Sequence, residues 1–211
     1  MKTTVVIILS ILALFFLRSC KTGYVNSFGD WTWVTIDESH GKRKHYIQGI
    51  DNTTFKVLSK KSFAMDNYQV YYNGKVINHA TPSGFVVLGN NNYGYAKDNK
   101  YAFFNNEVII GADPSTFEVL EFPYSKDKND VYCGTLPMKL SPEEVKTFKV
   151  TNEDKLMKGT LSTMKLNHFL EYNPDYAWLA STNPKITTVI TGEWGTGETI
   201  SANYVGFKRE K

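Results

Sequence analysis

Cysteine, proline and net charge are all scarce in this sequence of 211 residues. The two cysteines, Cys20 and Cys133, are too few for a disulfide framework or for a zinc site made of cysteines alone. With 7 prolines, 21% charged and 14% aromatic residues, the composition argues against disordered, collagen-like and coiled-coil proteins. The formal net charge of +3 falls by two, to +1, without Lys2 and Arg18, so we expect no nucleic-acid partner.

The apolar run at the N-terminus is too short for a membrane-spanning helix. It covers residues 5–17, whereas a spanning helix needs roughly 20 apolar residues, and its length is typical of a secretory signal peptide. The run ends in Leu17-Arg18-Ser19-Cys20, which resembles a bacterial lipobox except at Arg18. The resemblance implies a signal peptide at residues 1–19 and lipidation of Cys20, with an uncleaved anchor as the alternative. The chain would then be anchored to a membrane by lipid and face the periplasm or the cell exterior.

A repeat of about 30 residues occupies the middle of the chain. One element is a loop that ends in phenylalanine and continues into a Val-Leu pair; it occurs at residues 50–58, 80–88 and 112–120, with a weaker copy at 147–150. A second element is an Asp-containing turn followed by a triplet that is mostly aromatic and β-branched, at residues 64–72, 96–104 and 125–133. Both elements recur at the same spacing of about 30 residues, so chance similarity does not explain them.

The local chemistry of the repeat predicts an antiparallel β-meander. Short Asp and Asn side chains favour turns, and aromatic or β-branched triplets suit half-buried strands. Asn73-Gly74 stands between two apolar runs, which is a strong signal for a hairpin. We therefore expect a mainly β fold of antiparallel β-meander repeats, followed by a smaller mixed C-terminal region.

These motifs resemble the DKNYY repeat family of bacterial exported proteins. The resemblance rests on Tyr95-Ala96-Lys97-Asp98-Asn99-Lys100-Tyr101-Ala102-Phe103-Phe104 and on Tyr124-Ser125-Lys126-Asp127-Lys128-Asn129-Asp130-Val131-Tyr132-Cys133, and it extends over about residues 44–150. The sequence departs from the family pattern at Met65 and Cys133. The family implies repeat boundaries but no established biochemical activity.

The resulting division of the chain has four parts. Residues 1–19 are the signal peptide, 20–43 a tether and N-terminal edge hairpin, 44–150 the repeats, and 151–211 a C-terminal region of mixed α and β structure. Ser141-Pro142-Glu143-Glu144 is typical of a helix start, and residues 161–170 have a partial helical face. We expect strands at 186–191 and 199–205, joined into a hairpin by the glycine-rich loop 192–198.

Candidate sites are few. His40, His45, His79 and His168 are scattered, and no catalytic, cofactor or metal motif is present, so we expect no cofactor. The recurrent acids Asp98, Asp113 and Asp127 could bind calcium, but turn formation explains them better, and Cys133 replaces an aromatic residue and is expected to be buried. The strands that carry Tyr71, Phe103 and Tyr132 are apolar on both faces. These three residues belong either to a two-layer core or to an exposed aromatic strip that binds glycan or protein.

The sequence therefore predicts an extracytoplasmic lipoprotein that acts as a non-enzymatic β-repeat binding or interaction module. Its partner would be an envelope protein or a glycan, because repeat stacks usually present extended binding surfaces. One alternative is a hydrolase with a cleft between the repeats and the C-terminal region, for which His45 or His168 would have to meet Glu193 or Asp175. A second alternative is an immunity-type inhibitor protein.

Overall fold

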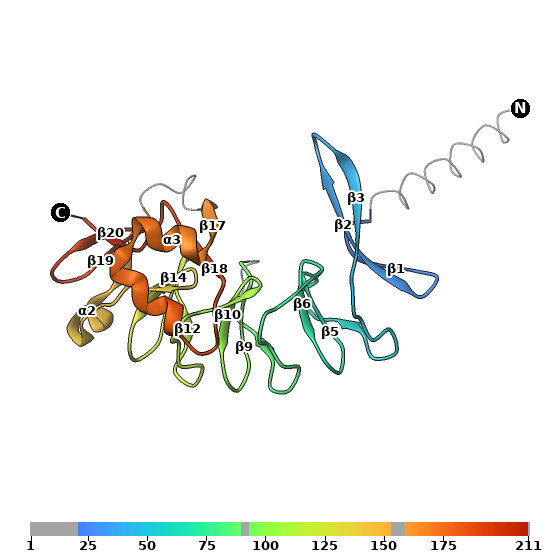
Figure 1. Cartoon of the computed structure of the whole chain (residues 1–211), viewed down its shortest axis with the longest axis horizontal. Helices are drawn as coiled ribbons and strands as arrows, with labels where there is room; N and C mark the ends of the chain where they lie inside the picture. Colours follow the sequence, from blue (N-terminus) through green and yellow to red (C-terminus); the bar gives the residue numbers. More distant parts are fainter. Residues whose placement is uncertain (1–20, 90–92, 153–158, 211) are drawn as a thin grey trace, which may run out of the picture.

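The computed structural model describes residues 21–89, 93–152 and 159–210 and confirms a mainly β, antiparallel architecture. Small sheets follow one another along the long axis of an elongated molecule (Figure 1). The predicted signal peptide and Cys20 lie outside the described residues.

An N-terminal sheet caps the first end of the row. It has the order β1 (Gly23–Ser27), β2 (Asp30–Asp37) and β3 (Gly41–Tyr46), so β2 and β3 form a hairpin that continues to Tyr46, past the expected boundary at residue 43, and β1 adds a third strand. Tyr24 and Trp31 place their rings 5.6 and 4.7 Å from the Phe55 ring of the first repeat. The sheet therefore covers aromatic surface that the first repeat would otherwise expose.

Three repeat units follow, each a four-stranded meander in which strands adjacent in sequence are adjacent in the sheet. Unit 1 consists of β4 (Lys56–Val57), β5 (Phe63–Met65), β6 (Val70–Tyr72) and β7 (Lys75–Val76); unit 2 of β8 (Val86–Val87), β9 (Tyr95–Lys97), β10 (Ala102–Phe104) and β11 (Glu107–Val108); unit 3 of β12 (Glu118–Val119), β13 (Tyr124–Lys126), β14 (Val131–Cys133) and β15 (Leu136–Pro137). Asn73 and Gly74 both have positive φ, 50° and 76°, which confirms the Asn-Gly hairpin.

A buried aspartate organises the turn of each of these units. The Oδ1 atom of Asp98 accepts hydrogen bonds from the backbone N–H groups of Lys100 and Tyr101, and its Oδ2 atom accepts one from the N–H of Thr81. Asp66 and Asp127 bond their own turns and loops in the same way. Each carboxylate thus ties the central turn of its unit to the loop that opens the unit.

A fourth unit is split in the sequence. Strand β16 (Lys149–Val150) pairs with β19 (Thr196–Glu198), which pairs with β20 (Asn203–Val205) and then β21 (Lys208–Arg209). This is the meander order of units 1 to 3, so residues 196–209 belong to a repeat although their sequence shows no resemblance to one. The weak copy at 147–150 contains its first strand, and the helix start expected at residues 141–144 is that of α2 (Pro142–Thr147), with Ser141 as N-cap in a capping box.

The insertion between β16 and β19 carries the remaining elements. They are β17 (Leu161–Lys165), α3 (Leu166–Tyr172), the 3₁₀-helix η2 (Pro174–Ser181) and β18 (Thr188–Gly192). The helix predicted over 161–170 begins only at Leu166, because the first five residues pair with β18. The predicted hairpin across 192–198 is wrong, since β18 and β19 belong to different sheets. Of the expected strand 199–205 only the last three residues form a strand, because the turn at Thr199 occupies the residues before them.

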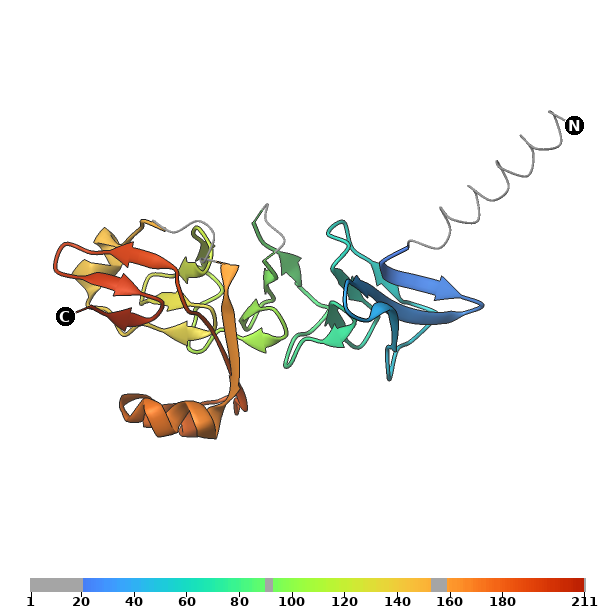
Figure 2. The same cartoon turned by 90° about the horizontal axis from the view of Figure 1, so that it is seen from above.

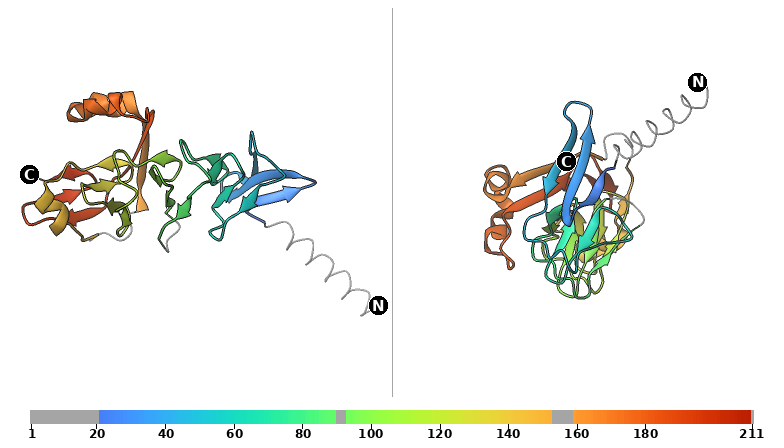
Figure 3. Two further views of the ribbon diagram at one scale, coloured as in Figure 1. Left: turned by 90° about the horizontal axis from the view of Figure 1, so that it is seen from below. Right: turned by 90° about the vertical axis from the view of Figure 1, so that its right-hand side faces the viewer.

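The hydrophobic core is a series of clusters between neighbouring units. Phe63 of unit 1 and Phe103 of unit 2 belong to one cluster, and Phe104 of unit 2 and Tyr132 of unit 3 to the next. The insertion packs its own cluster, with Phe169 and Leu179, against Ile110 and Leu136 of the repeats. Figure 2 shows α3 and the adjoining 3₁₀-helix at one side of the row, and the end-on view in Figure 3 shows the repeat units one behind another.

Candidate functional site

The aromatic residues proposed from sequence as a binding strip are core residues. The exposed fractions of Tyr71, Phe103 and Tyr132 are 0%, 0% and 1%. The strip interpretation is therefore wrong, because each unit stacks on a neighbour and both faces of its central strand are covered. The Tyr71 hydroxyl donates to Asp66 at 2.7 Å and the Tyr132 hydroxyl to Asp127 at 3.0 Å, so these phenols brace the turn aspartates.

The other polar candidates also have structural roles. Cys133 is fully buried, its Sγ lies 3.5 Å from the Gly192 carbonyl oxygen, and burial raises the pKa of its thiol to about 12. A thiol with such a pKa is a poor nucleophile at neutral pH. The Lys128 Nζ atom lies 2.8 Å from Asp113 Oδ2, and this ion pair lowers the pKa of the Asp113 carboxyl group. The Oδ1 atom of Asp113 accepts a hydrogen bond from the N–H of Ser115. The turn role expected of the recurrent acids is confirmed.

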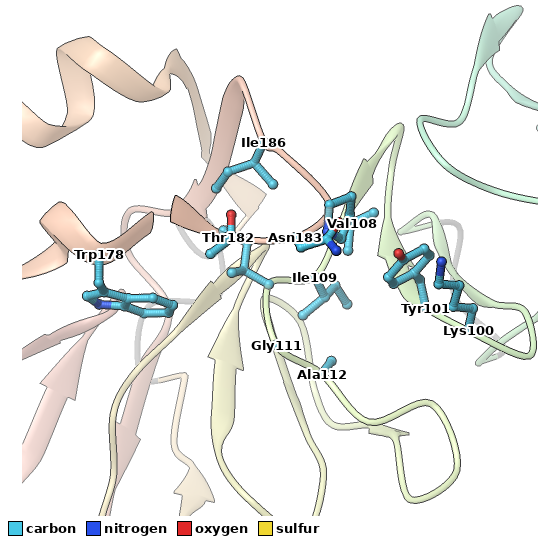
Figure 4. A pocket seen from close by; sticks show the side chains of 12 residues that line it. Lys100, Tyr101, Val108, Ile109, Gly111, Ala112, Trp178, Thr182, Asn183 and Ile186 are labelled. Atoms are coloured by element: carbon cyan, nitrogen blue, oxygen red, sulfur yellow. The ribbon is translucent and has the colours of Figure 1, made fainter. Parts of the chain in front are cut away.

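A groove lies between the repeats and the insertion (Figure 4). We call it the inter-repeat groove; its volume is about 260 Å³ and its described lining is Lys100, Tyr101, Val108, Ile109, Ile110, Gly111, Ala112, Trp178, Thr182, Asn183, Pro184 and Ile186. Three chain segments that are distant in sequence build it: the turn of unit 2, the connection from β11 toward unit 3, and η2 with the residues after it. Aliphatic residues occupy the middle, while Trp178 and Tyr101 lie at opposite ends.

The local chain explains how the two aromatic ends are held. Tyr101 follows the turn that Asp98 organises, because its backbone N–H donates to Asp98 at 2.8 Å. Trp178 lies on η2, which begins at Pro174 and is held down by the buried side chains of Tyr176 and Leu179. The indole of Trp178 remains 40% exposed, so its ring is presented rather than buried.

A lysine lies beside each aromatic end, but only Lys100 lines the groove; Lys139 is outside the described lining and is nearer the buried Tyr176 ring, at 4.5 Å. The Lys100 ammonium lies 5.0 Å from the centroid of the Tyr101 ring, and the Lys139 ammonium lies 5.5 Å from the Trp178 ring. Lys139 is held there because its Nζ also donates to the Asp175 carbonyl oxygen at 2.6 Å. The described lining contains no Asp, Glu, His or Cys side chain, so the groove offers apolar contacts and positive charge but no acid–base pair.

Sequence reasoning missed this groove. Its Trp178 lies in a segment, residues 174–181, to which no role was assigned, although Asn173-Pro174-Asp175 is a recognisable helix start. The contact between this helix and unit 2 joins residues about 80 positions apart, a separation that periodicity within one segment does not reveal.

A second cavity, of about 390 Å³, lies between the insertion and unit 4. It brings together His168 and Glu193 but includes neither His45 nor Asp175. The Nδ1 atom of His168 lies 3.2 Å from Glu171 Oε2, and both side chains are more than half exposed. Solvent therefore reaches His168 and Glu171 freely, and the geometry does not favour an acid–base site that is protected from water.

Two features are absent from the described part of the chain. Residues 21–89, 93–152 and 159–210 contain no group of three or more His, Cys, Asp or Glu side chains arranged to hold a metal ion. Among the same residues, no helix is both long and apolar enough to cross a membrane.

Comparison with protein-family models identifies the DKNYY family. The DKNYY family model matches residues 37–158 and, in an overlapping second match, residues 95–188. The matched region is longer than the repeats recognised from sequence, because it extends through most of the insertion. No curated protein and no solved structure matches the chain. Since the family model covers more than half of its length, the chain belongs to the DKNYY family.

Proposed function

We propose that this protein is a membrane-tethered extracytoplasmic lipoprotein that acts as a binding module, and that the inter-repeat groove is its binding site. The observation that carries the proposal is an apolar groove with the exposed ring of Trp178 at one end and the half-buried ring of Tyr101, beside Lys100, at the other. Aromatic residues presented on a rigid scaffold are typical of the energetic centre of a binding surface. The groove also lies between the repeats and the C-terminal insertion, where neither part alone would form it.

The chemistry of the lining favours a peptide segment over a glycan. Val108, Ile109 and Ile186 form a buried aliphatic floor, with exposed fractions of 4%, 1% and 7%, whereas only Thr182 and Asn183 offer uncharged polar side chains apart from the Tyr101 phenol. Lys100 is a cation of the lining, and Lys139 lies outside the lining beside Trp178. An extended peptide of an envelope protein, with apolar side chains between acidic ones, matches both the apolar middle and the charged ends.

Selection from a displayed library of random peptides tests the site and the ligand class together. We expect the full chain to enrich peptides in which aliphatic or aromatic residues lie between Asp or Glu residues. Enrichment should disappear with Trp178→Ala and should survive Trp194→Ala, because Trp194 is similarly exposed, at 47% against 40%, but does not line the groove. Equal enrichment by the unmodified chain and both variants would show that the groove is not the binding site. Glycan binding that depends on Trp178 would show that the ligand is a glycan and not a peptide.

The membrane tether is tested separately. Incorporation of labelled palmitate should occur in the intact chain and be lost in Cys20→Ala. Labelling unchanged by this substitution would contradict lipidation at Cys20. Cys133→Ser is the matched control, because the other cysteine is buried and should not affect labelling.

The two alternatives receive less support from the geometry. A hydrolase would need acid–base groups in the cleft between repeats and insertion, and the described lining of that groove has none. His168 and Glu193 share the second cavity, so a hydrolytic activity abolished by His168→Ala would favour the enzyme. An immunity-type inhibitor would be favoured if the selected peptide sequences came from a toxin domain.

A further inference from the structure

The second cavity, between the insertion and unit 4, is built by three parts of the chain. Residues of β17 and β18, of α3, and of the hairpin formed by β20 and β21 line it. Its volume of about 390 Å³ is in the range of sites that enclose a small organic ligand. Its described lining shares no residue with that of the inter-repeat groove, so the two are separate sites.

The walls of this cavity are apolar and partly aromatic. Met164 contributes from β17, Phe169 from α3, and Val205 and Phe207 from the hairpin of β20 and β21. The ring centroids of Phe169 and Phe207 lie 5.7 Å apart, so two aromatic rings meet in the wall. Aromatic rings gain from edge-to-face and offset contacts with another ring, and this wall therefore favours an aromatic ligand over an aliphatic one.

Two hydroxyl-bearing residues lie side by side on the floor of the cavity. Thr191 of β18 is opposite Ser162 of β17 in the antiparallel register, and residues opposite each other share a face of the sheet. Both residues line the cavity, and Thr191 is only 3% exposed. Val189, two positions before Thr191, is on the same face and belongs to one core cluster with Phe169, so this is the face that α3 covers.

The Thr191 hydroxyl has no hydrogen-bond partner among the residues that the structure describes. Buried hydroxyls are nearly always paired, because an unpaired one has lost its bonds to water without replacement. Thr135 shows the usual arrangement: its hydroxyl donates to the Ile190 carbonyl oxygen at 3.1 Å and accepts the Ile190 N–H at 2.9 Å. The Thr191 hydroxyl is instead available to a molecule inside the cavity that it lines.

The charged residues of the lining do not favour an ion. Glu193, Lys208 and Glu210 are exposed and carry charges of both signs. The Arg209 guanidinium lies 3.5 Å from Glu144, which is outside the lining, so its charge is matched elsewhere. A charged ligand would meet only exposed groups of mixed sign, and a neutral ligand therefore fits this cavity better.

We propose that the second cavity binds a small neutral aromatic molecule that carries a hydroxyl group, with its ring against Met164 and Phe207 and its hydroxyl on Thr191. The aromatic wall recognises the ring, and the unpaired Thr191 hydroxyl recognises the polar end. This site is additional to the inter-repeat groove, and the inference depends neither on peptide binding there nor on the membrane tether.

Titration with two matched probes tests the site. Para-ethylphenol has a ring, a short apolar tail and a hydroxyl group, whereas ethylbenzene lacks only the hydroxyl. The full chain is isotope-labelled at its methionine methyl groups and observed by NMR. We expect both probes to cause a saturable shift of the Met164 signal, because Met164 lines the cavity. The signals of Met65 and Met138, which lie in other core clusters, should not move.

Substitution of Thr191 tests the role of its hydroxyl. Thr191→Val keeps the shape of the side chain, and it should weaken the binding of para-ethylphenol about fivefold, as expected for loss of one hydrogen bond, with ethylbenzene unchanged. If this variant does not fold, Thr191→Ser and Thr191→Ala provide the same comparison, with and without the hydroxyl.

Three results would overturn the inference. The first is a Met164 signal that para-ethylphenol does not move. The second is a substitution of Thr191 that removes the hydroxyl but changes the affinities for both probes equally, or changes neither. The third is loss of probe binding in Trp178→Ala, because Trp178 belongs to the inter-repeat groove. Probe binding that Trp178→Ala leaves unchanged supports the second cavity, whatever the result of the peptide selection.

Discussion

The Tyr204 hydroxyl donates a hydrogen bond of 3.1 Å to the Glu144 carboxylate, although 60 residues separate the two in sequence. The corresponding tyrosines of units 1 and 3 donate to the aspartate of their own turn. Unit 4 has Thr199 at that turn, and its Oγ1 atom accepts the N–H groups of Ser201 and Ala202. In unit 4 the carboxylate that accepts this hydrogen bond belongs to α2 and not to the turn. The hydrogen bond from a buried tyrosine to an acid is therefore kept, although the acid comes from a different element.

The Glu144 carboxylate should make stability depend on pH in the acid range. Hydrogen bonds from the Ser201 hydroxyl and the Ser141 N–H lower the pKa of Glu144 to about 2, below its usual value of about 4.3. A lowered pKa in the folded state stabilises the protein above the unfolded pKa, and this stabilisation is lost as the pH falls through the folded pKa. We expect the free energy of unfolding to decrease between about pH 5 and pH 2, with a smaller decrease in Glu144→Gln.

Urea unfolding at a series of pH values measures this dependence. At pH 7 Glu144→Gln should cost about 2 kcal/mol, because hydrogen bonds to a charged acceptor become bonds to a neutral one. The neighbouring exposed Glu143 provides the control: Glu143→Gln should leave the pH profile unchanged. Identical acid profiles for Glu144→Gln and the unmodified chain would contradict a role for this carboxylate.

The turn aspartates should matter far more for stability than exposed acids do. Asp98→Ala removes the acceptor of three backbone N–H groups, those of Thr81, Lys100 and Tyr101. Partly buried donors left without a partner should cost about 3 kcal/mol in total, which lowers the Tm by about 9 °C for a chain of this size. Calorimetry should show no such loss of Tm for the control Asp175→Ala, because Asp175 is an exposed acid. A small effect of Asp98→Ala would contradict the role of Asp98 in holding its turn and loop together.

A glycine substitution tests the fourth unit directly. Gly197 lies at the centre of β19 against the ring of Phe148, and a Cβ atom there would overlap the ring. Gly197→Ala should therefore destabilise the chain by about 1–3 kcal/mol. Gly159→Ala is the matched control, because nothing lies within 4 Å of the added Cβ. If both substitutions have the same effect, β19 does not pack against Phe148 as described.

The number of reactive thiols reports on both cysteines. Cys133 is fully buried and should not react with Ellman's reagent in the native protein, because burial raises the pKa of the thiol to about 12. In denaturant, mature chain isolated from the cell envelope should show one thiol if Cys20 carries a lipid. Two thiols would contradict lipidation, and Cys133→Ser should remove the signal that remains.

Local chemistry made units 1 to 3 predictable from sequence. Asp66, Asp98 and Asp127 are required in their turns because side-chain oxygens accept the turn N–H groups, and such a requirement leaves a visible pattern. The Ser141 capping box is equally local, and its helix was predicted correctly. Burial of Tyr71 and its equivalents was one of two interpretations, since an apolar strand does not show whether a neighbouring unit covers its second face.

Unit 4 and the groove could not be predicted from sequence because their segments pair over long distances in the chain. Strand β16 finds its partner β19 after an insertion of 45 residues, from 151 to 195, and unit 4 has replaced the turn aspartate by Thr199. The small residue that must face the unit's phenylalanine became Gly197, where unit 1 has Ala64 and unit 2 has Ala96. The packing requirement was kept while the residue types changed, so similarity of sequence was lost. The inter-repeat groove depends on the same insertion and was missed for that reason.

The affinity of one selected peptide for three versions of the full chain tests the binding proposal most directly. Isothermal titration should give a Kd for Trp194→Ala equal to that of the unmodified chain. Trp178→Ala should weaken binding about 30-fold, equivalent to about 2 kcal/mol, as expected for loss of an exposed aromatic contact. Equal affinities for all three proteins would show that the peptide binds elsewhere and would contradict the assignment of the inter-repeat groove as the functional site.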